Sequence, residues 1–216
     1  MTYLRDPQSI TRESFDIIAR ETDLTHLDAN LRPIAVRMIH ACGMTDIADD
    51  IVCSPRFAHV SRCALQNGAN ILCDSNMTAA GIKRSLLPDG GRLIAPEFNE
   101  QLKTRAAKAK TTQSALIAES WGAALQDAVV VIGNAPTALF RLLELLMDGA
   151  SPVPAGIIGI PVGFVGASES KQKLIAYCQQ TQLEFLTIRG RRGGSAVAAA
   201  AVNAVLLDLS TSSEIQ

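Results

Sequence analysis

The chain has 216 residues, enough for one well-filled core, and we expect a single domain over residues 1–216. Hydrophobic residues make up 48 % of the chain and aromatic residues only 4 %, so aliphatic side chains should fill the space between helices and a sheet. The net charge of -1 and the single tryptophan argue against a nucleic-acid-binding protein.

Cysteine content and hydropathy indicate the cellular compartment in which the protein is expected. The five cysteines are odd in number and form no CxxC pair, so we expect neither a disulfide framework nor a zinc site, and no other metal site is indicated. Residues 1–9 contain no apolar run that would indicate a signal peptide. No stretch reaches the roughly 20 apolar residues of a membrane span. These features predict a soluble cytoplasmic protein with no membrane partner.

Two amphipathic helices are predicted first, over residues 9–22 and 31–42. In the second, apolar residues recur with helical spacing and Gly43 is a natural C-cap. His40 lies one step off this apolar stripe, on a flank shared with Arg37. That position suits a catalytic imidazole, although a lone histidine is more often a partly buried residue bonded to a carbonyl.

A helix begun by Ser54-Pro55 is predicted to run to about Asn67, and a short strand follows over residues 70–73. This strand ends in Asp74-Ser75-Asn76, directly before a helix of small residues. The three polar residues should therefore lie at the carboxyl edge of a parallel sheet, where ligands bind. Helix capping by Asp74 or Ser75 would explain either residue equally well.

Residues 86–96 contain two prolines and Gly90-Gly91 and are predicted to form a loop. A helix over residues 97–110 carries four basic residues that are not interrupted by an acid, a pattern typical of a solvated face. Thr111-Thr112 then offers an N-cap for a helix that reaches Leu125.

The continuous apolar run over residues 128–132 predicts a strand buried on both faces. It leads into Gly133-Asn134-Ala135-Pro136-Thr137, where glycine allows a tight turn, Asn134 can cap and proline suits the first helical turn. The free amides of the helix that follows should face the ligand space, where a negative group is favoured. We therefore predict that the binding site includes this turn.

Two further strands, over residues 155–160 and 184–188, also lead into helices. The first is followed by a turn and by a helix containing Lys171, with Ser168 or Ser170 as its cap. The second is followed by the arginine loop, residues 189–194, which precedes Ser195 and a long alanine-rich helix. Its Arg189, Arg191 and Arg192 can bind carboxylate or phosphate, and the alternative is an exposed turn whose arginines pair with surface acids.

Four strands that alternate with helices predict an α/β fold with an open, mainly parallel sheet and helices on both faces. The chain has no GxGxxG fingerprint, no P-loop and no GxSxG elbow.

Five segments, taken together and in this order, resemble the precorrin-8X methylmutase family of cobalamin biosynthesis. The resemblance extends over roughly residues 5–208, and its segments are Arg37-Met38-Ile39-His40, Asp74-Ser75-Asn76-Met77, Gly133-Asn134-Ala135-Pro136-Thr137-Ala138-Leu139, Gly159-Ile160-Pro161-Val162-Gly163-Phe164-Val165 with Glu169-Ser170-Lys171, and Arg189-Gly190-Arg191-Arg192-Gly193-Gly194-Ser195.

This resemblance implies an isomerase that moves a methyl group from C11 to C12 of precorrin-8X or cobalt-precorrin-8. It also implies a homodimer with the site near the subunit interface, no metal or organic cofactor, and His40 as the catalytic residue. The substrate would be a flat tetrapyrrole fringed with carboxylates. The residues expected to bind it are Arg37, Asp74, Ser75, Asn76, Gln113, Gly133, Asn134, Thr137, Lys171, Arg189, Arg191, Arg192 and Ser195.

Gln113 departs from the family pattern, in which an arginine often follows the matching pair of threonines. Glutamine can hydrogen-bond a carboxylate but cannot offset its charge, so Gln113 is the weakest of these candidates.

Two other functions remain open on the sequence. A non-catalytic corrinoid carrier would use the same edge of the sheet to hold the ring. A nucleotide-linked enzyme on a generic α/β fold is a weaker reading, because a fold alone does not establish a function.

Overall fold

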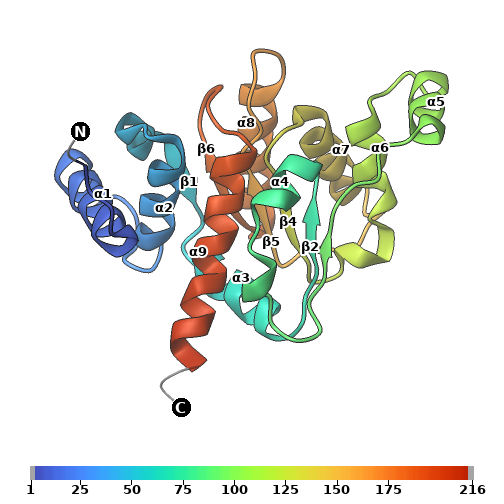
Figure 1. The fold of residues 1–216 in the computed structure, drawn as a ribbon. Helices are drawn as coiled ribbons and strands as arrows, with labels where there is room; N and C mark the ends of the chain where they lie inside the picture. Colours follow the sequence, from blue (N-terminus) through green and yellow to red (C-terminus); the bar gives the residue numbers. More distant parts are fainter. Residues whose placement is uncertain (1–2, 214–216) are drawn as a thin grey trace.

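A computed structural model describes residues 3–213, which form an α/β fold around one sheet (Figure 1). In chain order the elements are α1 (Pro7–Glu21), α2 (Arg32–Cys42), η1 (Thr45–Asp50), β1 (Ile51–Cys53), α3 (Phe57–Gln66), β2 (Ile71–Cys73), α4 (Asn76–Gly81), η2 (Arg84–Leu86), β3 (Leu93–Ile94), α5 (Glu100–Lys108), α6 (Gln113–Ser120), η3 (Gly122–Leu125), β4 (Val129–Ile132), α7 (Pro136–Met147), β5 (Gly156–Gly159), α8 (Ala167–Thr181), β6 (Glu184–Ile188) and α9 (Ser195–Ser213).

The sheet has the strand order β1-β6-β5-β4-β2-β3. Every neighbouring pair is parallel except β1 with β6. The predicted mainly parallel sheet is therefore confirmed, and so are its four central strands. Two edge strands were missed. The expectation that residues 86–96 form only a loop is wrong, because Leu93–Ile94 pairs with β2.

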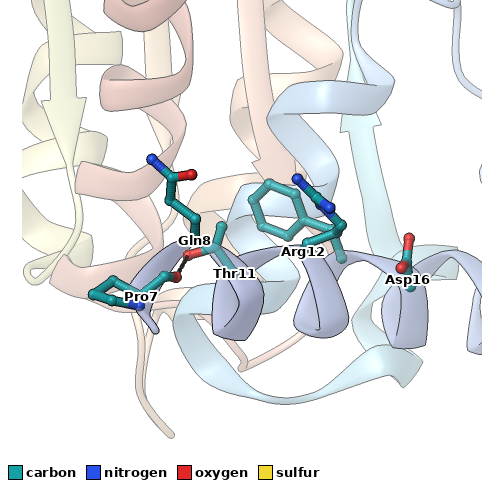
Figure 2. Close-up of a pocket in the computed structure, with 6 residues that line it drawn as sticks. Pro7, Gln8, Thr11, Arg12 and Asp16 are labelled. Atoms are coloured by element: carbon teal, nitrogen blue, oxygen red, sulfur yellow. Dashed lines mark hydrogen bonds between the residues drawn. The ribbon is translucent and has the colours of Figure 1, made fainter. Parts of the chain in front are cut away.

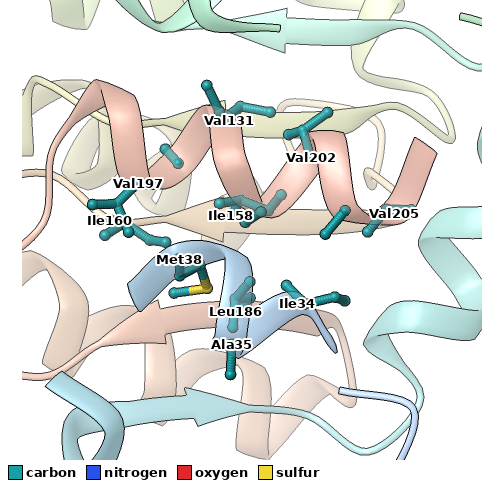
Figure 3. Packing of buried hydrophobic residues seen from close by; sticks show 14 of the residues in the cluster. Ile34, Ala35, Met38, Val131, Ile158, Ile160, Leu186, Val197, Val202 and Val205 are labelled. Carbon is teal, nitrogen blue, oxygen red and sulfur yellow. The ribbon is translucent and has the colours of Figure 1, made fainter. Parts of the chain in front are cut away.

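Helices cover both faces of the sheet, as predicted. Successive β4 residues point to opposite faces: Val129 and Val131 pack beneath α2 and α9, whereas Val130 and Ile132 pack beneath α6, α7 and α8. This double burial explains the uninterrupted apolar sequence of the strand. Figure 3 shows the first cluster, in which Met38 of α2 and Val202 of α9 lie over Ile158.

Several helix starts differ from the prediction. Asp6 caps α1 by accepting the N–H of Ser9 at 2.7 Å, so that helix begins before Ser9. The helix α8 begins after Gly166, which has a φ of 79°, and no side chain caps it, so neither Ser168 nor Ser170 has the predicted role. Thr112 does cap α6, but this helix ends at Ser120 and a 3-10 turn reaches Leu125.

Within residues 3–213, no helix combines the length and the apolar character that crossing a membrane requires.

Candidate functional site

Four strand ends bring the predicted site segments to one edge of the sheet (Figure 1). Because β2, β4, β5 and β6 are parallel, the turns that follow them share this edge, which we call the carboxyl rim. The rim comprises residues 74–76, 133–135, 161–166 and the arginine loop, residues 189–194.

Asp74 is fully buried in the rim and binds the chain itself. Its carboxylate accepts the amide N–H groups of Gly133 at 3.0 Å, Asn134 at 2.9 Å and Ala135 at 2.7 Å. Burial raises the pKa of Asp74, whereas these three amides and the hydroxyl of Thr78 lower it. Three amides of the turn before α7 are thus occupied by an internal carboxylate. The first-turn amides of α7, which the sequence assigned to an anionic ligand, are not among them.

Three buried hydroxyl groups extend this arrangement to α9. Thr78 Oγ1 lies 3.2 Å from Asp74 Oδ1, 2.8 Å from Ser75 Oγ and 2.9 Å from Ser195 Oγ. Ser75 also accepts the N–H of Thr78, which confirms that it caps α4. Asp74, Ser75, Thr78 and Ser195, which we call the rim network, therefore join the turns after β2 and β4 to the first residue of α9.

Gly133 leaves the space that the rim network needs. A Cβ atom at this position would lie 2.8 Å from Ser195 Cα and 2.9 Å from Thr78 Oγ1. Any side chain would push the turn after β4 away from α9.

Arg192 binds two acids of η1 rather than facing solvent freely. Its guanidinium donates to Asp46 Oδ2 at 2.5 Å and to Asp50 Oδ2 at 2.6 Å. The alternative of surface pairing therefore describes this arginine. Because η1 follows α2 closely, the two ion pairs bring the end of the His40 helix to the arginine loop.

Lys171 lies beneath the same loop, with 1 % of its surface exposed. Its Nζ donates to the carbonyl of Arg192 at 2.7 Å. Burial lowers the pKa of Lys171 to about 8, and the nearby Asp50 opposes this effect. The ammonium group therefore supports the loop backbone from within.

Arg189 and Arg191 are exposed at the rim. The guanidinium carbon of Arg191 lies 5.5 Å from the centroid of the Phe164 ring, a cation–π geometry. These two arginines remain available to a carboxylate ligand.

His40 is exposed in the last turn of α2. Its ring lies edge-on to Phe15 of α1, with 5.5 Å between the centroids, and Arg37 lies over the same Phe15 ring. The alternative of a partly buried histidine does not fit this exposure. Phe15 also lines a hollow of about 570 Å³ along α1, where Figure 2 shows Thr11, Arg12 and Asp16 on one side of the helix.

The remaining predicted residues lie at helix starts along the rim. Asn76, Asn134 and Thr137 are exposed, and Gln113 is partly exposed. Asn134 does not cap α7 as predicted, because the N-cap position is Ala135. Thr137 accepts a hydrogen bond from Thr112 at 2.8 Å, which joins the starts of α6 and α7.

Sequence reasoning missed the apolar character of the rim. Phe164 and Val165 of the rim are 86 % and 89 % exposed, and Met77, directly after the rim residue Asn76, is 75 % exposed. All three lie in the five segments quoted above, but the sequence alone did not indicate that they face solvent. In the described part of the chain, no group of three or more histidine, cysteine or acidic residues is arranged to hold a metal ion.

The chain is similar to known proteins in both sequence and fold. The sequence profile of the family described as precorrin-8X methylmutase matches residues 9–207. The chain is 50 % identical to the precorrin-8X methylmutase of Pseudomonas aeruginosa over 94 % of this chain and 96 % of that protein. It is 35 % identical to the cobalt-precorrin-8 methylmutase of Salmonella typhimurium over 97 % of this chain and 99 % of that protein. A crystal structure of precorrin-8X methylmutase from Thermus thermophilus is 30 % identical, with a TM-score of 0.81, and the match covers 95 % of this chain and 97 % of that one.

Proposed function

Because the chain belongs to the precorrin-8X methylmutase family, we propose that it is the isomerase of cobalamin biosynthesis that moves a methyl group from C11 to C12 of the corrin precursor. The product would be hydrogenobyrinate or cobyrinate. The observation that carries this proposal is the 50 % identity to a named methylmutase over nearly the full length of both chains.

The metal-free substrate, precorrin-8X, is the favoured one. The relative named for precorrin-8X shares 50 % of its residues with this chain, and the relative named for cobalt-precorrin-8 shares 35 %. Parallel incubations with precorrin-8X and cobalt-precorrin-8 would test this preference through the spectra of the products.

The reaction needs little from the protein beyond binding and one proton donor. A methyl shift within one molecule changes no net oxidation state and uses no external nucleophile. We assign the proton transfer to His40, which is exposed at the end of α2. An exposed imidazole can reach a macrocycle placed over the rim, and it can take the proton back from the rearranged ring.

We divide the predicted binding residues into two groups. Those with exposed or partly exposed side chains would contact the ligand: Arg37, Asn76, Gln113, Asn134, Thr137, Arg189 and Arg191. Those whose polar groups already bind the chain would act indirectly, by holding the rim in place: Asp74, Ser75, Lys171, Arg192 and Ser195, together with the Gly133 amide.

We further propose that the protein acts as a cytoplasmic homodimer with the site near the subunit interface. The open position of His40 supports this arrangement, because a second subunit could cover that side of the ring. Light scattering of the purified protein would measure the assembly.

A turnover assay separates the isomerase from the alternative carrier. A catalytic amount of protein should convert all of the added precorrin-8X. The conversion is measured through the absorbance of the tetrapyrrole. A carrier would give a shift limited to the amount of protein added. A thermal-shift assay with NAD(P) and ATP addresses the nucleotide-linked alternative, because a bound nucleotide would stabilise the fold.

A further inference from the structure

The loop between β5 and α8, residues 161–166, presents an apolar surface at the carboxyl rim. Phe164 and Val165 at its tip are 86 % and 89 % exposed. Large hydrophobic side chains that stand together in solvent commonly mark a binding surface. Neither residue belongs to the two clusters of buried hydrophobic residues that pack on the two faces of the sheet. The packing of the core therefore does not account for these two side chains.

The backbone of the loop is held firmly on the side of the arginine loop. Gly163 donates its N–H to the carbonyl of Arg191 at 3.2 Å, and Gly194 donates to the carbonyl of Ile160 at 2.9 Å. A Cβ atom at Gly193 would lie 2.4 Å from the Ile160 oxygen, so the two loops pack backbone to backbone.

The other end of the loop is equally confined. Gly166 has a φ of 79°, and a Cβ atom there would lie 3.2 Å from the Phe140 ring of α7. The loop is thus fixed between the arginine loop and α7, and its tip is directed outward by its backbone.

Positive charge accompanies this apolar tip. The guanidinium carbon of Arg191 lies 5.5 Å from the Phe164 ring centroid, and Arg189 is exposed in the same arginine loop. An aromatic ring beside an exposed guanidinium complements a ligand that is apolar across its plane and anionic at its edge.

We propose that Phe164 and Val165 pack against the macrocycle of the tetrapyrrole while Arg191 binds one of its peripheral carboxylates. This inference rests on the proposed function, since that function supplies the flat polycarboxylate ring. It adds a second set of contacts to the site: a hydrophobic surface at the carboxyl rim that would fix how the ring is seated relative to His40.

The test is an absorbance titration with the product, hydrogenobyrinate, on the full-length protein and its variants. Phe164→Ala should raise Kd about tenfold, the usual scale for losing one aromatic stacking contact, and should leave the salt dependence of Kd unchanged. Arg191→Ala should raise Kd and also flatten its salt dependence, because it removes a charge pair. Phe98→Ala is the control: this ring is 43 % exposed between β3 and α5, at the far edge of the sheet. Its Kd should match that of the wild type.

The possible outcomes are distinct. A Kd for Phe164→Ala equal to that of the wild type and of Phe98→Ala overturns the proposed contact. Light scattering gives a second test. If Phe164→Ala has a lower molar mass than the wild type, and its weaker ligand binding is explained by the separation of subunits, the proposed contact is overturned, because the tip is then a subunit contact. A wild-type protein that neither binds hydrogenobyrinate nor converts precorrin-8X removes the proposed function and this inference with it.

Discussion

Asp74 and Ala135 are joined by a hydrogen bond of 2.7 Å between the ends of β2 and β4. The same carboxylate oxygen also accepts the N–H of Asn134, and the other oxygen accepts that of Gly133. Three amides of the turn before α7 are thus bound by a carboxylate of the chain itself, next to a helix start of the kind that commonly binds anions in α/β proteins. The turn before α7 is therefore preorganised before any ligand arrives.

Replacing Asp74 with asparagine should lower the free energy of unfolding by about 3 kcal/mol, because a buried amide group would oppose the backbone N–H donors. Urea unfolding measures the change. Asp89→Asn, in an exposed loop, is the matched control and should be neutral. An unchanged unfolding free energy in Asp74→Asn would contradict the interpretation that both carboxylate oxygens are needed as acceptors for these backbone N–H groups.

Thr78→Val removes one hydroxyl from the rim network at nearly constant volume. We expect a loss of about 1–2 kcal/mol in unfolding free energy, since Asp74 and Ser195 each lose a partner. Thr78→Ser should restore most of it. Thr181→Val on the exposed face of α8 provides the control, because its hydroxyl donates to the Tyr177 carbonyl within the same helix, away from the rim network.

The double variant Thr78→Val/Ser195→Ala tests whether the network acts as a unit. The two changes should cost less together than the sum of the single changes, because they break a shared hydrogen bond of 2.9 Å. Strict additivity would mean that the two hydroxyls contribute independently.

The central strands could be predicted because each is a run of residues buried on both faces. In β4 all four residues are apolar, and this composition alone identifies the strand. The edge strands gave no such signal. β3 has two residues and follows two glycines, and β1 has three residues that pair with β6 more than 130 positions later. Pairing at that separation is fixed by tertiary packing, which local sequence patterns do not contain.

The sequence predicted which segments meet at the rim. It did not predict which of their polar side chains bind the chain itself and which face solvent. Polar residues after a strand indicate a ligand edge, yet a carboxylate that faces a ligand and one that faces backbone amides have the same local sequence. For Asp74 the partners lie 59 to 61 residues away. Lys171 likewise gives no sign in the sequence that its ammonium is enclosed, because its position on α8 relative to the arginine loop depends on the assembled fold.

Arg192 should stabilise the folded protein through its two ion pairs with η1. Arg192→Ala breaks two ion pairs with η1 and should reduce stability by about 1 kcal/mol, with the loss shrinking at high salt. A double-mutant cycle with Asp50→Asn measures the coupling directly. Arg20→Ala, which breaks an exposed pair with Glu13, should cost almost nothing. Equal losses of unfolding free energy in Arg192→Ala and Arg20→Ala would show that the ion pairs between η1 and the arginine loop do not stabilise the protein.

His40→Ala should reduce turnover of precorrin-8X by at least about a hundredfold, the usual range for loss of a general acid, while hydrogenobyrinate still binds. Single-turnover absorbance and an equilibrium titration separate these two effects. His59→Ala, another exposed histidine, on α3, should retain full turnover. Unchanged turnover in His40→Ala would remove the proposed proton donor.

Lys171 gives a prediction for alkaline pH. Burial lowers the pKa of its ammonium to about 8, whereas in the unfolded chain the group keeps its ordinary value of 10.5. Between these two values the unfolded chain binds more protons than the folded one, so the contribution of Lys171 to stability rises with pH across that window. Below about pH 8 both states are protonated, and the full cost of burying the charge remains.

The comparison with Lys171→Met isolates this effect, because other titrating groups are common to both proteins. We expect the unfolding free energy of the wild type to gain on that of Lys171→Met as pH rises from 8 to 10, as measured by urea unfolding at each pH. A neutral amine still donates to the Arg192 carbonyl, so the arginine loop should keep its position through the transition. A difference between the two proteins that stays constant over this range would show that Lys171 titrates near its ordinary pKa and is not enclosed by the loop.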